Sequence, residues 1–372
     1  MAPQAGSRTI GDFHEARVIL RSSKLRQAGP GANQADLSKP DEISFFFLDG
    51  EAHRKRRTAV AGLFAPRTVV TRHRAVMDST MDAIVADLRT RRRAPLDQLS
   101  WRMAVDVAAN IIGLGGDGHD SEGLARRLAD VLDSAAMRKP GLLGKLTFNV
   151  RMLLRAGRFY RRDMVPAIAA RRRAPRDDVI SLMVKENYSR KLMILECLSY
   201  GGAGMMTTRE FIVMCAWHLF GNESLRDRFL KEGDDGQIAI LEEILRLEPV
   251  ATFVARRASE NLEAGSSVVK QGEVVSINIR EANSDQAITG PCPRELDPDR
   301  ARRMKGVGSG MSFGDGPHRC PGAQVALHET RVFLDRMLRL PGIRLETEPT
   351  ISWNAFIQGY ELRGAIVACD PA

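Results

Sequence analysis

The sequence lacks the features of several protein classes. No apolar run approaches the roughly 18 residues that a membrane-spanning helix needs, and the longest, 211–220, contains His218. Residues 1–7 show no basic region followed by an apolar stretch, so no secretory signal is predicted and a cytoplasmic protein is expected. There are no internal repeats and no low-complexity linker, which predicts one domain over residues 1–372.

The cysteines form no recognisable framework. The chain has five of them, without a CxxC pair: Cys197, Cys215, Cys292, Cys320 and Cys369. This pattern argues against a structural zinc site and against a disulfide-stabilised scaffold. It leaves open that one cysteine acts as a functional thiolate.

Positive charge is in excess, with 55 basic and 46 acidic side chains and a formal net charge of +9. Basic residues cluster at 54–57, 91–93, 171–173 and 300–305. These clusters are scattered among apolar helical residues, and no zinc-finger or RNA-binding aromatic signature accompanies them. They indicate solvated faces or a docking surface for an acidic partner, with nucleic-acid binding as the weaker alternative.

Hydrophobic periodicity predicts a mainly α protein with a small β portion. A capping box formed by Asp12 and Glu15 predicts the start of the first helix. The helical segments are expected at 13–21, 49–114, 124–131, 142–169, 178–185, 192–219 and 323–338. Strand signals lie at 268–270 and 274–279, on either side of a turn, and at 343–345 and 361–367. We therefore expect β-rich segments at about 250–300 and 341–368.

One glycine-rich loop carries a cysteine to the start of a helix. Residues 312–322 read SFGDGPHRCPG, and the predicted helix 323–338 follows. Backbone N–H groups and the positive end of a helix both stabilise a thiolate at Cys320. The alternative is a small buried apolar residue in a turn. The spacing of Phe, Gly and Cys should arise by chance in roughly one in ten thousand such chains, which favours the functional interpretation.

This loop resembles the haem-binding signature of the cytochrome P450 superfamily, the haem-thiolate monooxygenases. The resemblance implies that Cys320 is the axial ligand of the haem iron and favours O–O cleavage. It implies that Phe313 packs on the thiolate side, where Gly314, Gly316 and Gly322 let the backbone approach the ring. Pro321 departs from the pattern, because it supplies no N–H to the sulfur.

The family resemblance extends over most of the chain. Segment 13–21 resembles the family's second helix, which implies that the first helix and most of the first strands are absent. Glu243 and Arg246 resemble the ExxR pair, which in the family is structural. Their i, i+3 spacing places both side chains on one helix face.

Four basic residues match positions that bind the haem propionates in the family. The segment 49–57, reading DGEAHRKRR, supplies His53 and Arg57, whose i, i+4 spacing lets both face one anion. Arg256 and His318 match two further positions. Taken without the family, His53 and Arg57 are equally compatible with a solvated basic helix.

The segment Ala203-Gly204-Met205-Met206-Thr207-Thr208 resembles the oxygen-activating part of the family's central helix. Small residues there leave room for dioxygen, and a threonine hydroxyl relays protons. The resemblance gives this relay to Thr207, with Thr208 or water as further routes. Met206 stands where the family usually has a carboxylate, and a thioether donates no proton. Without the family, the two methionines are core residues.

The substrate pocket is expected to be largely apolar, which fits a hydrophobic small molecule. By position, the residues that should face it are Met205, Thr252, Phe253, Val254 and the turn at Glu361 and Leu362. The loop 29–44 resembles the family's variable lid.

The resemblance implies a soluble bacterial monooxygenase that uses haem b and O2 and acts in secondary metabolism or catabolism. No flavin or iron–sulfur motif is present, so electrons are expected from a separate ferredoxin and ferredoxin reductase. Neither nucleic acid nor a membrane is an expected partner. Basic residues around the loop form the expected ferredoxin-docking face: Arg300, Arg302, Arg303, Lys305, Arg319 and Arg331.

Two alternatives remain open within this interpretation. Met206 is compatible with a non-hydroxylating or peroxide-driven oxidation. Together with the short N-terminal part, it is also compatible with a haem-binding relative that has lost turnover.

Overall fold

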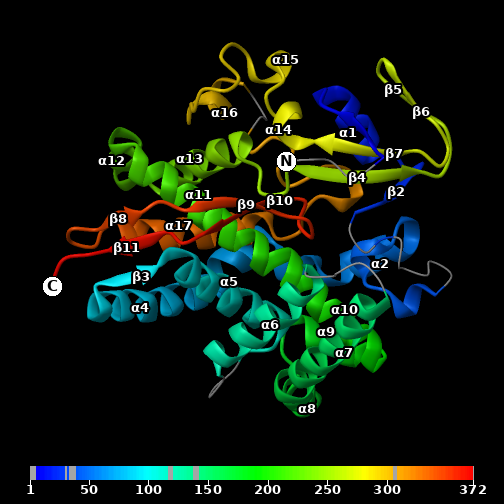
Figure 1. Cartoon of the computed structure of the whole chain (residues 1–372), viewed down its shortest axis with the longest axis horizontal. Helices are drawn as coiled ribbons and strands as arrows, with labels where there is room; N and C mark the ends of the chain where they lie inside the picture. The colour runs from blue at the N-terminus through cyan, green and yellow to red at the C-terminus, as the bar shows by residue number, and fades with distance from the viewer. Residues whose placement is uncertain are drawn as a thin grey trace.

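The computed structural model describes residues 6–29, 32, 39–115, 120–136, 142–304 and 308–371. The chain is mainly helical with small sheets, as predicted (Figure 1). The α-helices are α1 (Phe13–Arg21), α2 (Gly50–Ala61), α3 (Pro66–Thr68), α4 (Arg74–Arg91), α5 (Leu96–Ile112), α6 (Ser121–Ala136), α7 (Leu142–Phe159), α8 (Val165–Arg173), α9 (Val179–Lys185), α10 (Arg190–Tyr200), α11 (Thr207–Gly221), α12 (Glu223–Lys231), α13 (Asp234–Leu247), α14 (Ile279–Ala282), α15 (Gln286–Thr289), α16 (Arg300–Arg303) and α17 (Ala323–Leu338). Short 3₁₀ or π segments are η2 (Pro40–Glu42), η3 (Phe45–Phe47), η4 (Gly62–Phe64), η5 (Val69–His73), η6 (Tyr160–Met164), η7 (Gly201–Met206) and η8 (Gly316–His318).

The described strands form four small sheets. They are β1 (Arg8–Ile10), β2 (Leu25–Gln27), β3 (Arg93–Pro95), β4 (Phe253–Ala258), β5 (Leu262–Ala264), β6 (Ser267–Val269), β7 (Val274–Asn278), β8 (Arg344–Thr347), β9 (Thr350–Asn354), β10 (Gly359–Arg363) and β11 (Ile366–Ala368). The largest sheet has the order β1-β7-β4-β2, and the others are β3-β11-β8, β10-β9 and β5-β6. In Figure 1 the largest sheet and the β5-β6 hairpin lie at the upper right, and α4 to α10 lie in the lower half of the molecule.

Two of the predicted strands do not pair with each other. The sequence placed a turn between 268–270 and 274–279, and strands β6 and β7 do form there. However, β6 pairs with β5, and β7 lies between β4 and β1. The parallel β1–β7 pairing was not predicted. It joins residues more than 260 positions apart, and a local sequence pattern cannot predict such a pairing.

The first helix begins where the sequence predicted. The Asp12 side chain accepts a hydrogen bond from the Glu15 N–H at 2.8 Å. Glu15 does not complete the capping box, because its carboxylate instead accepts hydrogen bonds from Ser266 and Ser267. The residue therefore ties α1 to the β5-β6 hairpin.

The region 49–114, whose pattern predicts helices, is mainly helical and contains α2, α4 and α5. It is divided by η4 and η5 and by the strand β3, which pairs with β11 near the end of the chain. Pro95 in β3 is compatible with an edge position in its sheet. Half of the expected loop over 29–44 lies outside the described residues.

A long helical unit, α10-η7-α11, runs through the centre of the molecule (Figure 1). Its middle, η7, is a π segment that contains Gly201, Gly202 and Gly204. Single π turns inside α-helices are frequent at functional sites. Side chains of α5 and α17 pack against this unit in the main hydrophobic core. None of the described helices is long and apolar enough to cross a membrane.

Candidate active site

The glycine-rich loop closes on itself just before α17. The Cys320 N–H donates to the Phe313 carbonyl at 2.8 Å, and the Gly314 N–H donates to the Met311 carbonyl at 2.7 Å. Gly316 has φ +66°, and a Cβ there would lie 2.5 Å from the carbonyl oxygen of Leu20. Only glycine therefore lets the loop pass the end of α1.

Cys320 is reachable by solvent and also closely surrounded by protein. The residue is exposed to solvent, yet burial is the largest influence on its pKa and raises it. A side chain that lines a recess combines these two properties, because solvent reaches it while protein atoms surround it. The Gly322 N–H hydrogen-bonds the sulfur, and Arg57 and Arg319 lie close enough for their charges to lower the same pKa. The loop thus retains one amide donor to the sulfur although Pro321 supplies none.

Three basic residues from two distant segments meet beside this loop. The rings of His53 and His318 lie 4.1 Å apart between centroids, and His318 Nε2 lies 2.8 Å from Asp49 Oδ1. Arg57 donates to the backbone carbonyl of Arg319. The predicted neighbourhood of His53, Arg57 and His318 is therefore present.

His53 has an unused polar atom in this cluster. Its side chain is buried, and its Nε2 has no hydrogen-bond partner within the described chain. Burial, with the nearby charges of His318 and Arg57, lowers the pKa of His53 to about 4. A buried polar atom without a partner is costly, so this nitrogen is suited to bind a further group.

Arg256 is a second buried base without a matching acid. It donates to Gln27 Oε1 at 2.7 Å and to the Ala255 carbonyl at 2.9 Å. No carboxylate of residues 6–29, 39–115, 120–136, 142–304 or 308–371 pairs with it at ion-pair distance, and Asp49 only acts from further away. Burial lowers the pKa of Arg256 to about 10. The cluster of His53, Arg57, Arg256 and His318 fits an anionic group, because buried cations require neutralising partners.

The central helix presents an open surface at the predicted oxygen segment. Ala203 and Gly204 are exposed, and a Cβ added at Gly204 would meet no atom within 4 Å. The Thr207 hydroxyl donates to the Ala203 carbonyl at 2.6 Å. Met206 and Thr208 are buried. Of the two threonines, Thr207 is therefore the more accessible.

The predicted Glu243–Arg246 pair is formed and fully buried. Arg246 Nε and Nη2 bind the two carboxylate oxygens of Glu243 at 2.7 and 2.8 Å. Arg300 Nε lies 3.2 Å from Glu243 Oε1, so one carboxylate binds two arginines. This arrangement holds α13 against the segment that precedes the glycine-rich loop.

Two of the arginines predicted for a docking face are buried. Arg300 is engaged with Glu243 and with the Thr289 carbonyl, and Arg331 with Asp234 and Gln237. Neither is available to a partner, and this part of the prediction is wrong. Arg302, Arg303 and Arg319 are exposed, whereas Lys305 lies outside the described residues.

The predicted pocket set is partly wrong. Met205 and Leu362 have no exposed surface and belong to the main core, so neither lines an open cavity. The Phe253 ring is buried edge-on to Trp353 at 6.1 Å. Of the remaining members, Thr252 donates its hydroxyl hydrogen bond to the Pro249 carbonyl. Glu361 forms ion pairs with Arg209 and Arg363. Val254 is half-exposed.

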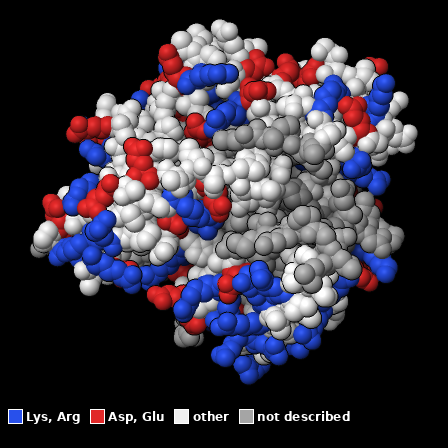
Figure 2. Space-filling view, in the orientation of Figure 1, with Lys and Arg blue, Asp and Glu red and all other residues white. Residues whose placement is uncertain are grey.

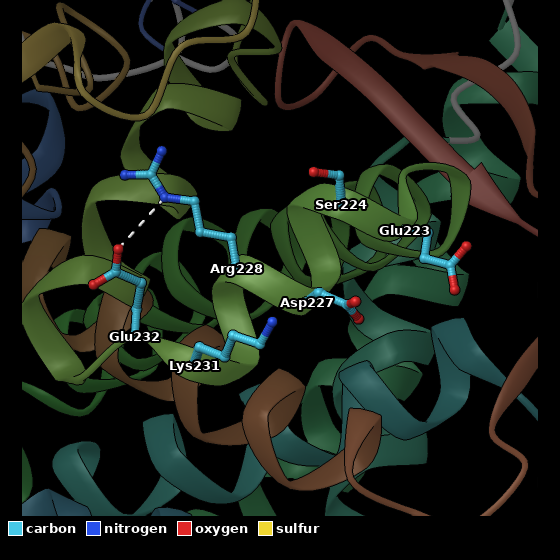
Figure 3. A pocket seen from close by; sticks show the side chains of 6 residues that line it. All are labelled: Glu223, Ser224, Asp227, Arg228, Lys231 and Glu232. Atoms are coloured by element: carbon cyan, nitrogen blue, oxygen red, sulfur yellow. Dashed lines mark hydrogen bonds and ion pairs between the residues drawn. The ribbon is translucent and has the colours of Figure 1, made fainter.

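A surface hollow on α12 is distinct from this site. Polar residues line it, and Arg228 and Glu232 pair across it at 3.4 Å (Figure 3). It contains none of the predicted site residues.

Two contributors were not predicted from the sequence. Asp49 directly precedes α2, and its acidic side chain at the start of a basic helix was the available signal. Gln27 gave no signal, because only the β2–β4 pairing brings it to Arg256.

Comparisons with known proteins identify the family. The family model described as "Cytochrome P450" matches residues 238–346, from the Glu243–Arg246 pair through the cysteine loop. The chain belongs to the cytochrome P450 superfamily. As a P450 it is a monooxygenase, an oxidoreductase that depends on haem.

Relatives align over most of this P450. The biotin biosynthesis cytochrome P450 of Bacillus subtilis (strain 168) is 26% identical over 351 residues, which is 90% of this chain and 84% of the relative. Nocardicin C N-oxygenase of Nocardia uniformis subsp. tsuyamanensis is 26% identical over 370 residues, 95% of this chain and 83% of the relative.

Solved structures share the P450 fold. P450BioI in complex with an acyl carrier protein ligated to hexadec-9Z-enoic acid has a TM-score of 0.79 and 23% identity, and covers 97% of this chain and 92% of that one. CalO2 has a TM-score of 0.81 and 20% identity, and the match covers 98% of this chain and 90% of that one.

Proposed function

We propose that this P450 binds haem b through Cys320 and inserts one oxygen atom from O2 into a hydrophobic small molecule. The observation that carries the proposal is the recessed Cys320 thiol beside a cluster of four basic side chains that has too few carboxylates to neutralise it. A haem would match both features, because its iron would bind the thiolate and its propionates would neutralise the basic side chains. When bound, haem supplies the O2 chemistry, and a thiolate ligand favours O–O cleavage.

The basic cluster would hold the propionates. His53 Nε2 is free to donate once the ring is protonated, and a bound anion would raise its pKa from the depressed value near 4. Arg256 would replace weak neutral acceptors with a carboxylate. Arg57 lies between this cluster and the thiol, so it would respond to both.

On the opposite side, the central helix would shape the oxygen pocket. Ala203 and Gly204 leave room because they carry little or no side chain. Thr207 would hold a proton at its hydroxyl, whose present partner is the Ala203 carbonyl. Met206 neither donates nor stores a proton, so proton delivery would depend on Thr207 and water.

Met206 keeps a second candidate function open. A non-hydroxylating or peroxide-driven oxidation needs less proton delivery than reductive O2 activation, and a relative without turnover needs none. The amount of product formed per NADPH, compared with the amount formed with peroxide, distinguishes these cases.

The electron donor would be a separate ferredoxin with its reductase. The face that docks it would include Arg302, Arg303 and Arg319, which surround the cysteine loop in sequence and are exposed. We place the reaction in bacterial secondary metabolism or catabolism, in the cytoplasm.

The first test is the absorption spectrum of the reduced, carbon-monoxide-bound protein. We expect a Soret band shifted far to the red for the wild type and for Cys292→Ala, which removes another exposed cysteine. Cys320→Ala should lose this band. No haem uptake by the wild type, or a band typical of a neutral ligand, would overturn the proposal.

A further inference from the structure

Helix α7 exposes an unusual number of large apolar side chains. Leu146, Val150, Leu153 and Leu154 are 60%, 50%, 74% and 64% exposed, and they are four of the nine large apolar residues exposed in the described chain. Their spacing is i, i+4, i+7 and i+8, which places them in one stripe on a helix. The stripe extends over about 12 Å at 1.5 Å per residue.

The stripe lies opposite the face by which α7 packs. Phe159 is fully buried, and Met152 packs against the main core. At 100° per residue, these two side chains point roughly away from Leu146 and Val150. The helix therefore already buries one apolar face and presents a second one outward. An exposed contiguous apolar patch of this kind marks an interaction surface.

Along the sequence, the charged residues that accompany the stripe are all basic. Between Asp133 and Asp163 the sequence has no acidic residue, but it has eight basic ones: Arg138, Lys139, Lys145, Arg151, Arg155, Arg158, Arg161 and Arg162. Arg151 and Arg158 are exposed along one border of the stripe. Figure 2 shows Lys and Arg gathered at the lower edge of the molecule, where Figure 1 places α7 and α8.

The charge determines which partner fits. A second copy of the chain would place two basic helices against each other, which like-charge repulsion opposes. The stripe is convex and aliphatic, without the aromatic anchors that dominate protein interfaces. A bilayer surface adapts to a convex helix, takes aliphatic side chains into the acyl boundary and offers phosphates to the flanking arginines.

We propose that α7 docks this P450 onto an anionic lipid surface. The docking is interfacial and needs no spanning helix. It is independent of the substrate and of the electron donor. Since both the apolar stripe and the arginines contribute, binding should require anionic lipid and should weaken as salt is added.

Vesicle co-sedimentation of the haem-loaded full-length protein tests this proposal. The probes are vesicles of phosphatidylcholine with 30% phosphatidylglycerol, and vesicles of phosphatidylcholine alone. We expect the double variant Leu153→Asn/Leu154→Asn to bind the anionic vesicles at least tenfold more weakly than the wild type. Arg151→Gln/Arg158→Gln should weaken binding and flatten its salt dependence.

The matched control lies on the β5-β6 hairpin, which Figure 1 shows at the upper right, well above α7. Val268 is 55% exposed, and Lys270 is an exposed base. The variant Val268→Asn/Lys270→Gln makes the same kinds of change there and should bind like the wild type. An unchanged haem spectrum in each variant shows that it is folded.

Three results would overturn the proposal. They are no sedimentation of the wild type with anionic vesicles, equal binding of the α7 variants and the wild type, or equal loss in the hairpin control. Capture of an acidic protein by the stripe without vesicle binding would assign α7 to that protein instead.

Discussion

At the scale of single residues, the two adjacent threonines of the central helix have different surroundings. Thr207 is half-buried and donates to Ala203, which borders the open space, whereas Thr208 is buried. Thr207→Val removes the accessible hydroxyl and keeps the shape. We expect the share of electrons lost as hydrogen peroxide to rise by roughly an order of magnitude, because a positioned proton donor accelerates the proton transfer that competes with peroxide release.

Thr208→Val is the control, since it makes the same change one position later. It should leave peroxide release close to the wild-type value. The same measurement during NADPH oxidation serves both variants. Equal effects of the two substitutions, or an effect of Thr208→Val alone, would show that Thr207 is not the specific proton relay.

His53 makes the stability of the haem-free protein depend on pH. Its pKa in the folded protein is about 4, whereas the ordinary pKa of a histidine side chain, which applies in the unfolded chain, is 6.5. Between these two values the unfolded state binds more protons, so stability rises with pH and is lost as the pH falls from 6.5 towards 4. A shift of this size corresponds to at most about 3 kcal/mol.

The variant His53→Gln removes this titration and leaves those of His73 and His318. We expect its free energy of unfolding, measured by urea denaturation, to fall less between pH 7.5 and pH 5 than that of the wild type. Haem loading should reduce the difference, because an anion beside His53 favours the protonated ring. Identical losses in both proteins would show that His53 does not titrate in this way.

At the scale of elements, Glu243 fixes α13 to the segment that follows α15. Its carboxylate binds Arg246 and Arg300 and accepts the Asp297 N–H at 3.0 Å. Glu243→Gln would leave two buried arginines without a counter-charge, which should cost about 3–5 kcal/mol of unfolding free energy. Glu242→Gln, one position earlier and only half-buried, should change it by less than about 0.5 kcal/mol. Urea denaturation of the two variants checks this difference, and similar losses would contradict it.

The elements also show what local sequence determines. The bounds of α1 and α17 were predicted from periodicity, a capping residue and the glycine-rich loop, all of which are local signals. The strands β1, β2 and β3 have three residues each and exist through distant partners, so periodicity could not find them. The same reason explains the site: the motif identified Cys320, whereas the contact of Arg300 with Glu243 depends on tertiary packing.

At the scale of the whole molecule, the net charge of +9 is distributed over surfaces with different surroundings. Around the cysteine loop, Arg303 pairs with Asp297, and Arg302 lies 3.7 Å from Asp299. Arg319 makes no ion pair with any residue that the structure describes, and it is exposed one position before Cys320. It therefore offers the most available positive charge for an acidic electron donor at the thiolate side.

Reversal of this charge separates local docking from the general effect of net charge. Arg319→Glu should slow reduction by an acidic ferredoxin about tenfold at low ionic strength, because it places like charges at the contact. Its backbone carbonyl still accepts the Arg57 hydrogen bond, so haem binding should persist.

Arg89→Glu makes the same change in net charge at the exposed end of α4 and should have little effect. The difference should vanish in about 0.5 M salt, where the screening length falls well below 10 Å. Stopped-flow reduction rates over a salt series measure this, and equal slowing by both variants would show that net charge alone governs the encounter.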